Sequence, residues 1–109
     1  MGITKSSIFS DRQNEIAAIA KAIGHPARVS ILQHMADTPG CICGDLVEET
    51  GLAQPTVSQH LKELKRVGLI QGTVEGTSMC YCINKMNWNK IKSMFEQLFH
   101  RLETSKCNC

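Results

Sequence analysis

The sequence predicts a mainly α-helical domain with one small β-hairpin, in the element order α-α-β-α-α-β-β-α. Residues 91–102 carry the strongest helical pattern, because their apolar side chains recur every three or four positions. Residues 69–83 instead form two short extended runs around a Glu-Gly-Thr-Ser turn, which is typical of a hairpin. The chain has 109 residues, which is enough for a single hydrophobic core.

Glycine and proline delimit the first two helices. We expect the first helix over residues 11–23, where isoleucines recur at helical spacing and Gly24 ends the pattern. Pro26 suits the first position of a second helix, because the N–H that proline lacks has no helical partner there. A turn at residues 37–40 is expected to end this second helix.

Two further helices are expected close together along the chain. The third begins near Gly44 and Asp45 and stops at Gly51. The fourth opens at residues 53–55 and closes at Gly68, and its apolar stripe is formed by Val57, Leu61, Leu64 and Val67. The short connection between the two helices has the spacing of a helix-turn-helix.

The hairpin and a last helix complete the domain. We expect strands at residues 69–74 and 79–83, joined by a tip at 75–78, and a short extended segment at 41–43. Asn87 is expected to cap the last helix. The apolar stripe of that helix is larger than a small core needs, so we expect a homodimer in which it pairs with the first helix of a second copy. The stripe consists of Ile91, Met94, Phe95, Leu98, Phe99 and Leu102.

Charge and hydropathy limit the class of protein. The net charge is only +2, but acidic residues dominate 41–55 and basic residues dominate 56–72. No apolar run reaches the ~18 residues that a membrane-spanning helix needs. The N-terminal residues lack the pattern of a secretory signal. We therefore expect a cytoplasmic protein with no membrane partner.

The polar face of the fourth helix predicts contact with double-stranded DNA. In a helix-turn-helix the second helix lies in the major groove, with its N-terminal side chains facing the base edges. The candidates for these contacts are Gln54, Thr56, Ser58, Gln59 and His60. Three basic residues that follow are expected to neutralise phosphates, namely Lys62, Lys65 and Arg66. The alternative is an ordinary amphipathic helix with a solvated face, but the hairpin that follows favours a winged helix-turn-helix.

Six cysteines occur as three C-x-C pairs, which are Cys41/Cys43, Cys80/Cys82 and Cys107/Cys109. In winged helices the segment before the third helix commonly pairs with the returning strand of the hairpin. Side chains two residues apart share one face of a strand, so the first two pairs would converge on one patch. Thiolates favour ions such as As(III), Cd(II) or Zn(II). We therefore hypothesise a four-thiol metal site at the first two pairs, which the two tail cysteines could complete.

Other interpretations of the cysteines stay open. A disulfide between the two C-x-C segments could form and break reversibly, provided that the Cα atoms lie within ~7 Å. Buried cysteine also serves as a small hydrophobe without a chemical role. An enzyme is not expected, because C-x-C differs from the C-x-x-C of thiol oxidoreductases and no phosphate-binding glycine loop or hydrolase elbow is present.

Four motifs make the chain resemble the ArsR/SmtB repressors. They are H-P-A-R-V-S-I-L (residues 25–32), G-D-L-V (44–47), Q-P-T-V-S-Q-H-L-K-E-L (54–64) and G-L-I (68–70). The resemblance spans about residues 12–102. It implies a homodimeric bacterial repressor that binds operator DNA near its own promoter and is released by an inducer. Members of the family respond to arsenite, to cadmium, zinc, lead or nickel ions, or to reactive sulfur, and some sense no metal.

Two positions depart from the family pattern. Many metal-sensing relatives have a cysteine three residues before the acidic residue of the third helix, where this chain has Ile42 between Cys41 and Cys43. The usual thiolate site of the family therefore does not transfer residue for residue. The hairpin tip carries Glu75 and no lysine or arginine, so the fourth helix must supply most of the affinity for DNA.

Together these observations predict a dimeric DNA-binding repressor that is released by arsenite or a soft metal ion and needs no resident cofactor. We expect an N-terminal arm at residues 1–10, a DNA-binding and dimerisation domain at 11–102, and a cysteine-containing tail at 103–109. One alternative is a repressor of the same fold that senses oxidants or reactive sulfur, or that senses no metal. Another is a thiol metal-binding protein without a role on DNA.

Overall fold

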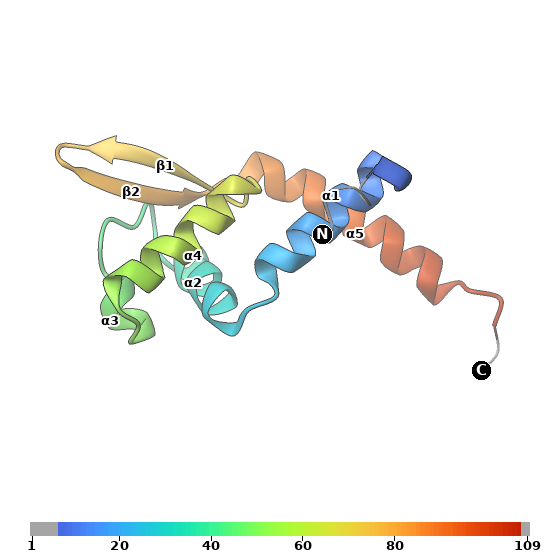
Figure 1. Cartoon of the computed structure of the whole chain (residues 1–109), viewed down its shortest axis with the longest axis horizontal. Helices are drawn as coiled ribbons and strands as arrows, with labels where there is room; N and C mark the ends of the chain where they lie inside the picture. Colours follow the sequence, from blue (N-terminus) through green and yellow to red (C-terminus); the bar gives the residue numbers. More distant parts are fainter. Residues whose placement is uncertain (1–6, 108–109) are drawn as a thin grey trace.

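Figure 1 shows a computed structural model of the chain, and the structure describes residues 7–107. Within this range the elements are α1 (Asp11–Ile23), α2 (Pro26–Asp37), α3 (Leu46–Thr50), α4 (Gln54–Arg66), β1 (Ile70–Glu75), β2 (Ser78–Ile83) and α5 (Lys85–Glu103). The predicted fold class is confirmed: α3 and α4 form the helix pair of a winged helix-turn-helix, and β1 and β2 form its wing. No helix in the described part of the chain is long and apolar enough to cross a membrane.

Local capping fixes where the first two helices begin. At α1, the N–H of Gln13 donates to Oγ of Ser10, while the N–H of Ser10 donates to Oε1 of Gln13. At α2, the N–H of Ala27 donates to Nδ1 of His25, and Pro26 occupies the first turn. α1 has the predicted bounds, and α2 begins at the predicted residue.

The predicted cap of the last helix is wrong by one turn. Asn84 caps α5, because its Oδ1 accepts a hydrogen bond from the N–H of Asn87. The side chain of Asn87 instead donates to the carbonyl oxygen of Gly68 at 2.9 Å. The indole N–H of Trp88 donates to the carbonyl oxygen of Leu69, also at 2.9 Å. These two bonds fix the start of α5 against the turn between α4 and β1.

The core lies where α2, α4 and the start of β1 meet. Ile31, Leu64 and Leu69 have no exposed surface there. The first half of α5 packs against this core, but its second half does not, since Phe99 is 55% exposed and Leu102 is 64% exposed. α1 and α5 lie together at the end of the molecule away from the hairpin (Figure 1). The apolar stripe of α5 therefore extends beyond the core of one copy.

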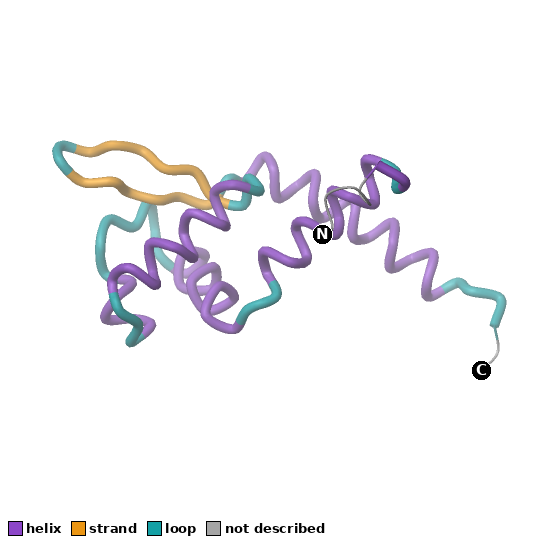
Figure 2. Tube along the Cα trace, in the orientation of Figure 1, coloured by secondary structure: helices purple, strands orange, loops and turns teal. Residues whose placement is uncertain are grey.

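The wing contains a third paired segment beside its two strands. Glu75 and Ser78 are the last paired residues of the hairpin, so its turn is shorter than the predicted tip at 75–78. Ile42 forms an antiparallel bridge with Tyr81 through two hydrogen bonds of 2.8 Å. β2 is thus the middle strand, between β1 and the loop from α2 to α3, and Figure 2 shows this loop rising to the hairpin. The predicted pairing of residues 41–43 with the returning strand is confirmed.

Candidate nucleic-acid interface and cysteine cluster

α4 presents a polar face to solvent because its apolar stripe is buried. Val57, Leu61 and Leu64 point into the core, at 2%, 5% and 0% exposure. The opposite face is exposed and carries seven of the predicted contact residues: Gln54, Thr56, Ser58, Gln59, Lys62, Lys65 and Arg66. Its first half offers hydrogen-bond donors and acceptors, and its second half offers positive charge. This arrangement matches what base edges and phosphates require of a helix in the major groove.

His60 is not on this face. It is 7% exposed, and its Nδ1 accepts a hydrogen bond of 3.0 Å from Nε of Arg28. The ring of His25 lies 4.5 Å from the His60 ring, measured between centroids. Burial lowers the pKa of His60, and its electrostatic interactions with His25 and Arg28 lower it further. Position 60 follows Val57 by three residues, so helical spacing already indicated the buried side.

α3 is held on α2 by side chains that sequence reasoning did not single out. Nε2 of His34 lies 3.1 Å from a carboxylate oxygen of Asp45, and its Nδ1 lies 3.7 Å from Glu49. The hydroxyl of Thr50 donates to the carbonyl oxygen of Leu46 at 2.7 Å and closes the short helix. The two His34 contacts join α2 to the start and the middle of α3.

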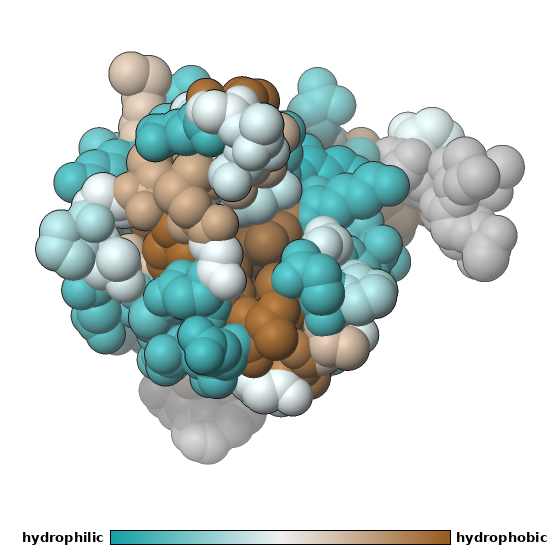
Figure 3. All heavy atoms as spheres, turned by 90° about the vertical axis from the view of Figure 1, so that its left-hand side faces the viewer, coloured by the Kyte–Doolittle hydropathy of each residue, from teal (hydrophilic) through white to brown (hydrophobic). Residues whose placement is uncertain are grey.

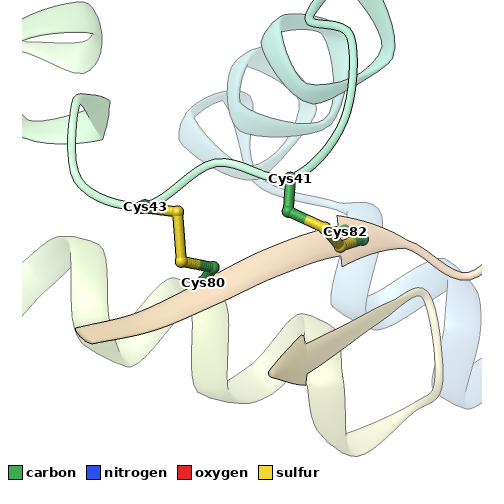
Figure 4. Close-up of a disulfide and its surroundings, with 4 residues drawn as sticks. All are labelled: Cys41, Cys43, Cys80 and Cys82. Atoms are coloured by element: carbon green, nitrogen blue, oxygen red, sulfur yellow. A yellow bond between two sulfur atoms is a disulfide. The ribbon is translucent and has the colours of Figure 1, made fainter. Parts of the chain in front are cut away.

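The register of the wing brings the two C-x-C segments face to face. Ile42 and Tyr81 form the hydrogen-bonded pair, so their neighbours occupy the closer positions of an antiparallel ladder. Cys41 lies opposite Cys82 with a Cα–Cα distance of 4.5 Å, and Cys43 lies opposite Cys80 at 4.2 Å. Each pair is joined as a disulfide (Figure 4). In the structure these four cysteines are therefore in the disulfide state.

The two disulfides have different surroundings. Cys80 has no exposed surface, although its partner Cys43 is exposed. Cys41 and Cys82 are half-buried and line a cavity of about 840 Å³, together with apolar side chains of α2 and the indole of Trp88. The two ends of the cysteine cluster therefore meet different environments.

The tail cysteines do not join this cluster in the described part of the chain. Cys107 is disulfide-bonded, and Cys109 lies outside the described residues. The prediction that the tail completes a metal site stays a prediction.

The wing rests on an incompletely filled contact with the helix pair. Seen from the hairpin end, apolar side chains form a central band between hydrophilic ones (Figure 3). A cavity of about 90 Å³ lies between the hairpin, α3 and α4, and Ile42, Leu61 and Tyr81 are among its lining residues. The contact between the wing and the helix pair is therefore not completely filled by side chains.

Comparison with known proteins places this geometry in a family. A sequence profile of bacterial regulatory proteins of the arsR family matches residues 25–71. The chain is 32% identical over 85 residues to the HTH-type transcriptional regulator YgaV of Escherichia coli (strain K12). The aligned residues cover 78% of this chain and 86% of YgaV. It is 33% identical over 89 residues to the uncharacterized HTH-type transcriptional regulator MJ1325 of Methanocaldococcus jannaschii, covering 81% of this chain and 99% of that protein.

A solved structure shows the same architecture. It is the homodimeric winged helix-turn-helix DNA-binding domain Mb0332 of Mycobacterium bovis, described as a possible ArsR-family regulator. The match has a TM-score of 0.65 and 25% sequence identity, and it covers 93% of this chain and 97% of that one.

Proposed function

Because the chain belongs to the ArsR/SmtB family of winged helix-turn-helix transcriptional regulators, we propose that it is a repressor that binds operator DNA as a homodimer through α4 and is released by a thiol-directed inducer. The chain is a transcriptional regulator and not an enzyme. The observation that carries the proposal is the exposed polar and basic face of α4, whose apolar side is anchored in the core.

Two groups of residues on the exposed face of α4 are proposed to make different contacts with DNA. Thr56, Ser58 and Gln59 lie in its first half and are proposed to contact base edges. Lys62 and Lys65 lie in its second half and are proposed to neutralise phosphates. None of the described residues at the wing tip is a cation that could share this task. The tip carries the carboxylate of Glu75 instead.

Two copies are needed to read the two half-sites of an operator. The apolar side chains of Phe99 and Leu102, in the second half of α5, are exposed in one copy of the chain. Burying such side chains against a second copy supplies the hydrophobic driving force for a dimer. In a two-fold dimer of this kind the α4 helices would lie about one DNA turn apart, roughly 34 Å.

The cysteine cluster is the proposed site for the inducer. Its four cysteines join β2 to the loop that leads directly into α3. A chemical change there therefore acts on the connection between the wing and the helix pair. After reduction, the four thiols would offer sulfur ligands to As(III), Cd(II) or Zn(II).

A second candidate signal is oxidation itself. Both cross-strand pairs have Cα–Cα distances below the upper limit of ~7 Å for a disulfide. The same four cysteines would then sense an oxidant or reactive sulfur, with disulfide formation in place of ion binding.

A DNA-binding titration tests the proposal and separates the two signals. The reduced protein is bound to a labelled duplex from the promoter upstream of its own gene, and As(III), Cd(II), Zn(II) or an oxidant is added. We expect wild-type protein to dissociate and the Cys80→Ser, Cys82→Ser variant to stay bound. If that variant releases the duplex as readily as wild type, the inducer site is wrong. If the reduced wild type binds no duplex at any salt concentration, the repressor function is wrong.

A further inference from the structure

We propose that Glu75 is a metal ligand, and that Cys43, Cys80 and Glu75 together form a site for a borderline divalent cation such as Zn(II). This inference rests on the proposed function, because it assigns donor atoms to one class of inducer. A carboxylate oxygen of Glu75 and the sulfur atoms of the two cysteines all lie within 4.8 Å of one another. They come from three separate segments: β1, β2 and the loop before α3.

The strand register explains how Glu75 reaches the sulfur atoms. Thr73 is paired with Cys80 and Glu75 is paired with Ser78, so Glu75 lies diagonally across from Cys80 on the same face of the wing. Diagonal neighbours lie about 7–8 Å apart, within reach of a long side chain. Cys43 approaches Cys80 from the other side of β2. The three donors thus converge near the hairpin tip.

The same register separates this site from the second cysteine pair. Cys41 and Cys82 lie beyond the Ile42–Tyr81 bridge, two residues along each strand. Two residues along a strand span about 6.6 Å. Thiolates on one zinc ion, each about 2.3 Å from the metal, lie within about 4 Å of each other. The group of donor atoms that all lie within 4.8 Å of one another includes Glu75 but neither Cys41 nor Cys82, so Glu75 offers a nearer third ligand for the Cys43–Cys80 end than the second cysteine pair does.

The donor set favours one class of inducer over another. Two thiolates and one carboxylate are ordinary ligands of Zn(II), with water completing a tetrahedral shell. As(III) is a soft thiol-directed species that gains little from a carboxylate. Glu75 is therefore expected to matter for Zn(II) and not for As(III).

Ion binding at this site and its disulfide exclude each other. Two equivalents of a thiol reductant convert the Cys43–Cys80 disulfide into two cysteine thiols, and the reductant becomes a disulfide. Zn(II) then binds and releases the two thiol protons. The ion would hold the loop before α3 to both strands of the wing, where the disulfide holds it to β2 alone.

Metal titration of the fully reduced protein under nitrogen tests the assignment, with Co(II) as a spectroscopic probe for Zn(II). We expect a tetrahedral Co(II) spectrum with thiolate charge-transfer bands, which the Cys43→Ser, Cys80→Ser variant loses and the Cys41→Ser, Cys82→Ser variant keeps. Glu75→Gln should weaken Zn(II) binding by at least about tenfold and leave As(III) binding unchanged. Glu96→Gln, at an exposed position of α5, is the matched control and should bind both as wild type does.

The outcomes separate this inference from the proposed function. If Glu75→Gln binds Zn(II) as tightly as wild type and gives the same Co(II) spectrum, Glu75 is not a ligand and the inference fails. Duplex release by As(III) from wild-type protein would then still support the repressor. If the variants bind metal as predicted but the reduced wild-type protein binds no duplex DNA, the proposed function fails instead. Unchanged circular dichroism and ion-free duplex binding of Glu75→Gln show that its fold is intact.

Discussion

Nε of Arg28 donates a hydrogen bond of 3.0 Å to Nδ1 of His60 and so joins α2 to α4. A second nitrogen of the guanidinium, Nη1, donates to the carbonyl oxygen of Ala22 at 3.1 Å. One arginine therefore connects the end of α1, the start of α2 and the middle of the proposed DNA-reading helix. The position of α4 depends on a polar contact as well as on its apolar stripe.

Removal of the His60 ring should destabilise the fold. His60→Ala leaves a cavity beside α2 and takes the acceptor from Arg28, so we expect a loss of about 1–3 kcal/mol in the free energy of unfolding. Urea denaturation followed by circular dichroism measures this loss. Gln59→Ala, next along the helix and exposed, should change the free energy by less than about 0.5 kcal/mol. Equal midpoints for the two variants would contradict the structural role of His60.

The same contact predicts a pH dependence of stability. The pKa of His60 in the folded state lies below its ordinary value of 6.5, because burial and the electrostatic interactions with His25 and Arg28 disfavour the imidazolium. As the pH falls below 6.5, the unfolded state therefore binds a proton that the folded state does not, and stability falls until the pH passes the lowered pKa. Denaturation of wild type and His60→Gln across this window should show a smaller loss in the variant. Parallel curves would contradict the assignment.

Lys62 should contribute electrostatic affinity without sequence preference. Lys62→Ala removes one phosphate contact, so binding should weaken alike for operator and random duplexes, and the salt slope should fall by about 1. Fluorescence anisotropy at several salt concentrations measures both effects. Lys106→Ala, at an exposed position after the end of α5, removes the same charge at the end of the molecule away from α4 and should leave the slope unchanged. Identical slopes for wild type and Lys62→Ala would remove Lys62 from the interface.

A charge in the exposed stripe of α5 should break the dimer. Phe99→Asp places a carboxylate on the surface that two copies are proposed to bury, and an unpaired buried charge is costly. Sedimentation at micromolar concentration should show wild type as a dimer and this variant as a monomer with intact secondary structure. Val74→Asp, 70% exposed on the wing, is the control and should stay dimeric. A wild type that sediments as a monomer would contradict the dimer model.

The sequence predicted the parts of the fold that depend on local patterns. The bounds of α1 follow from its isoleucine spacing and Gly24, and the pairing of residues 41–43 with β2 follows from the order of elements. The sequence could not show which residue caps α5, because asparagines stand three residues apart at positions 84 and 87. The choice between them depends on the tertiary bond from Asn87 to Gly68.

The candidate site, like the fold, could be predicted only where it depends on local sequence patterns. The exposed residues of α4 could be predicted from periodicity, and the meeting of the two C-x-C segments could be predicted from the order of elements. His60 was misplaced because its polarity was given more weight than its spacing from Val57. Glu75 could not be found from sequence, because its place beside Cys80 depends on the register that pairs Thr73 with Cys80. Register is set by pairing across strands, which no local pattern fixes.

The central claim is that the wing cysteines and the DNA face of α4 are coupled, and a reciprocal affinity measurement tests it most directly. The Kd of the reduced protein for its promoter duplex is measured with and without saturating Zn(II) or As(III), and the Kd for the ion is measured with and without duplex. We predict that each ligand weakens the other by the same factor, of about 5- to 150-fold. Equal duplex affinity in the presence and absence of bound ion would contradict the account.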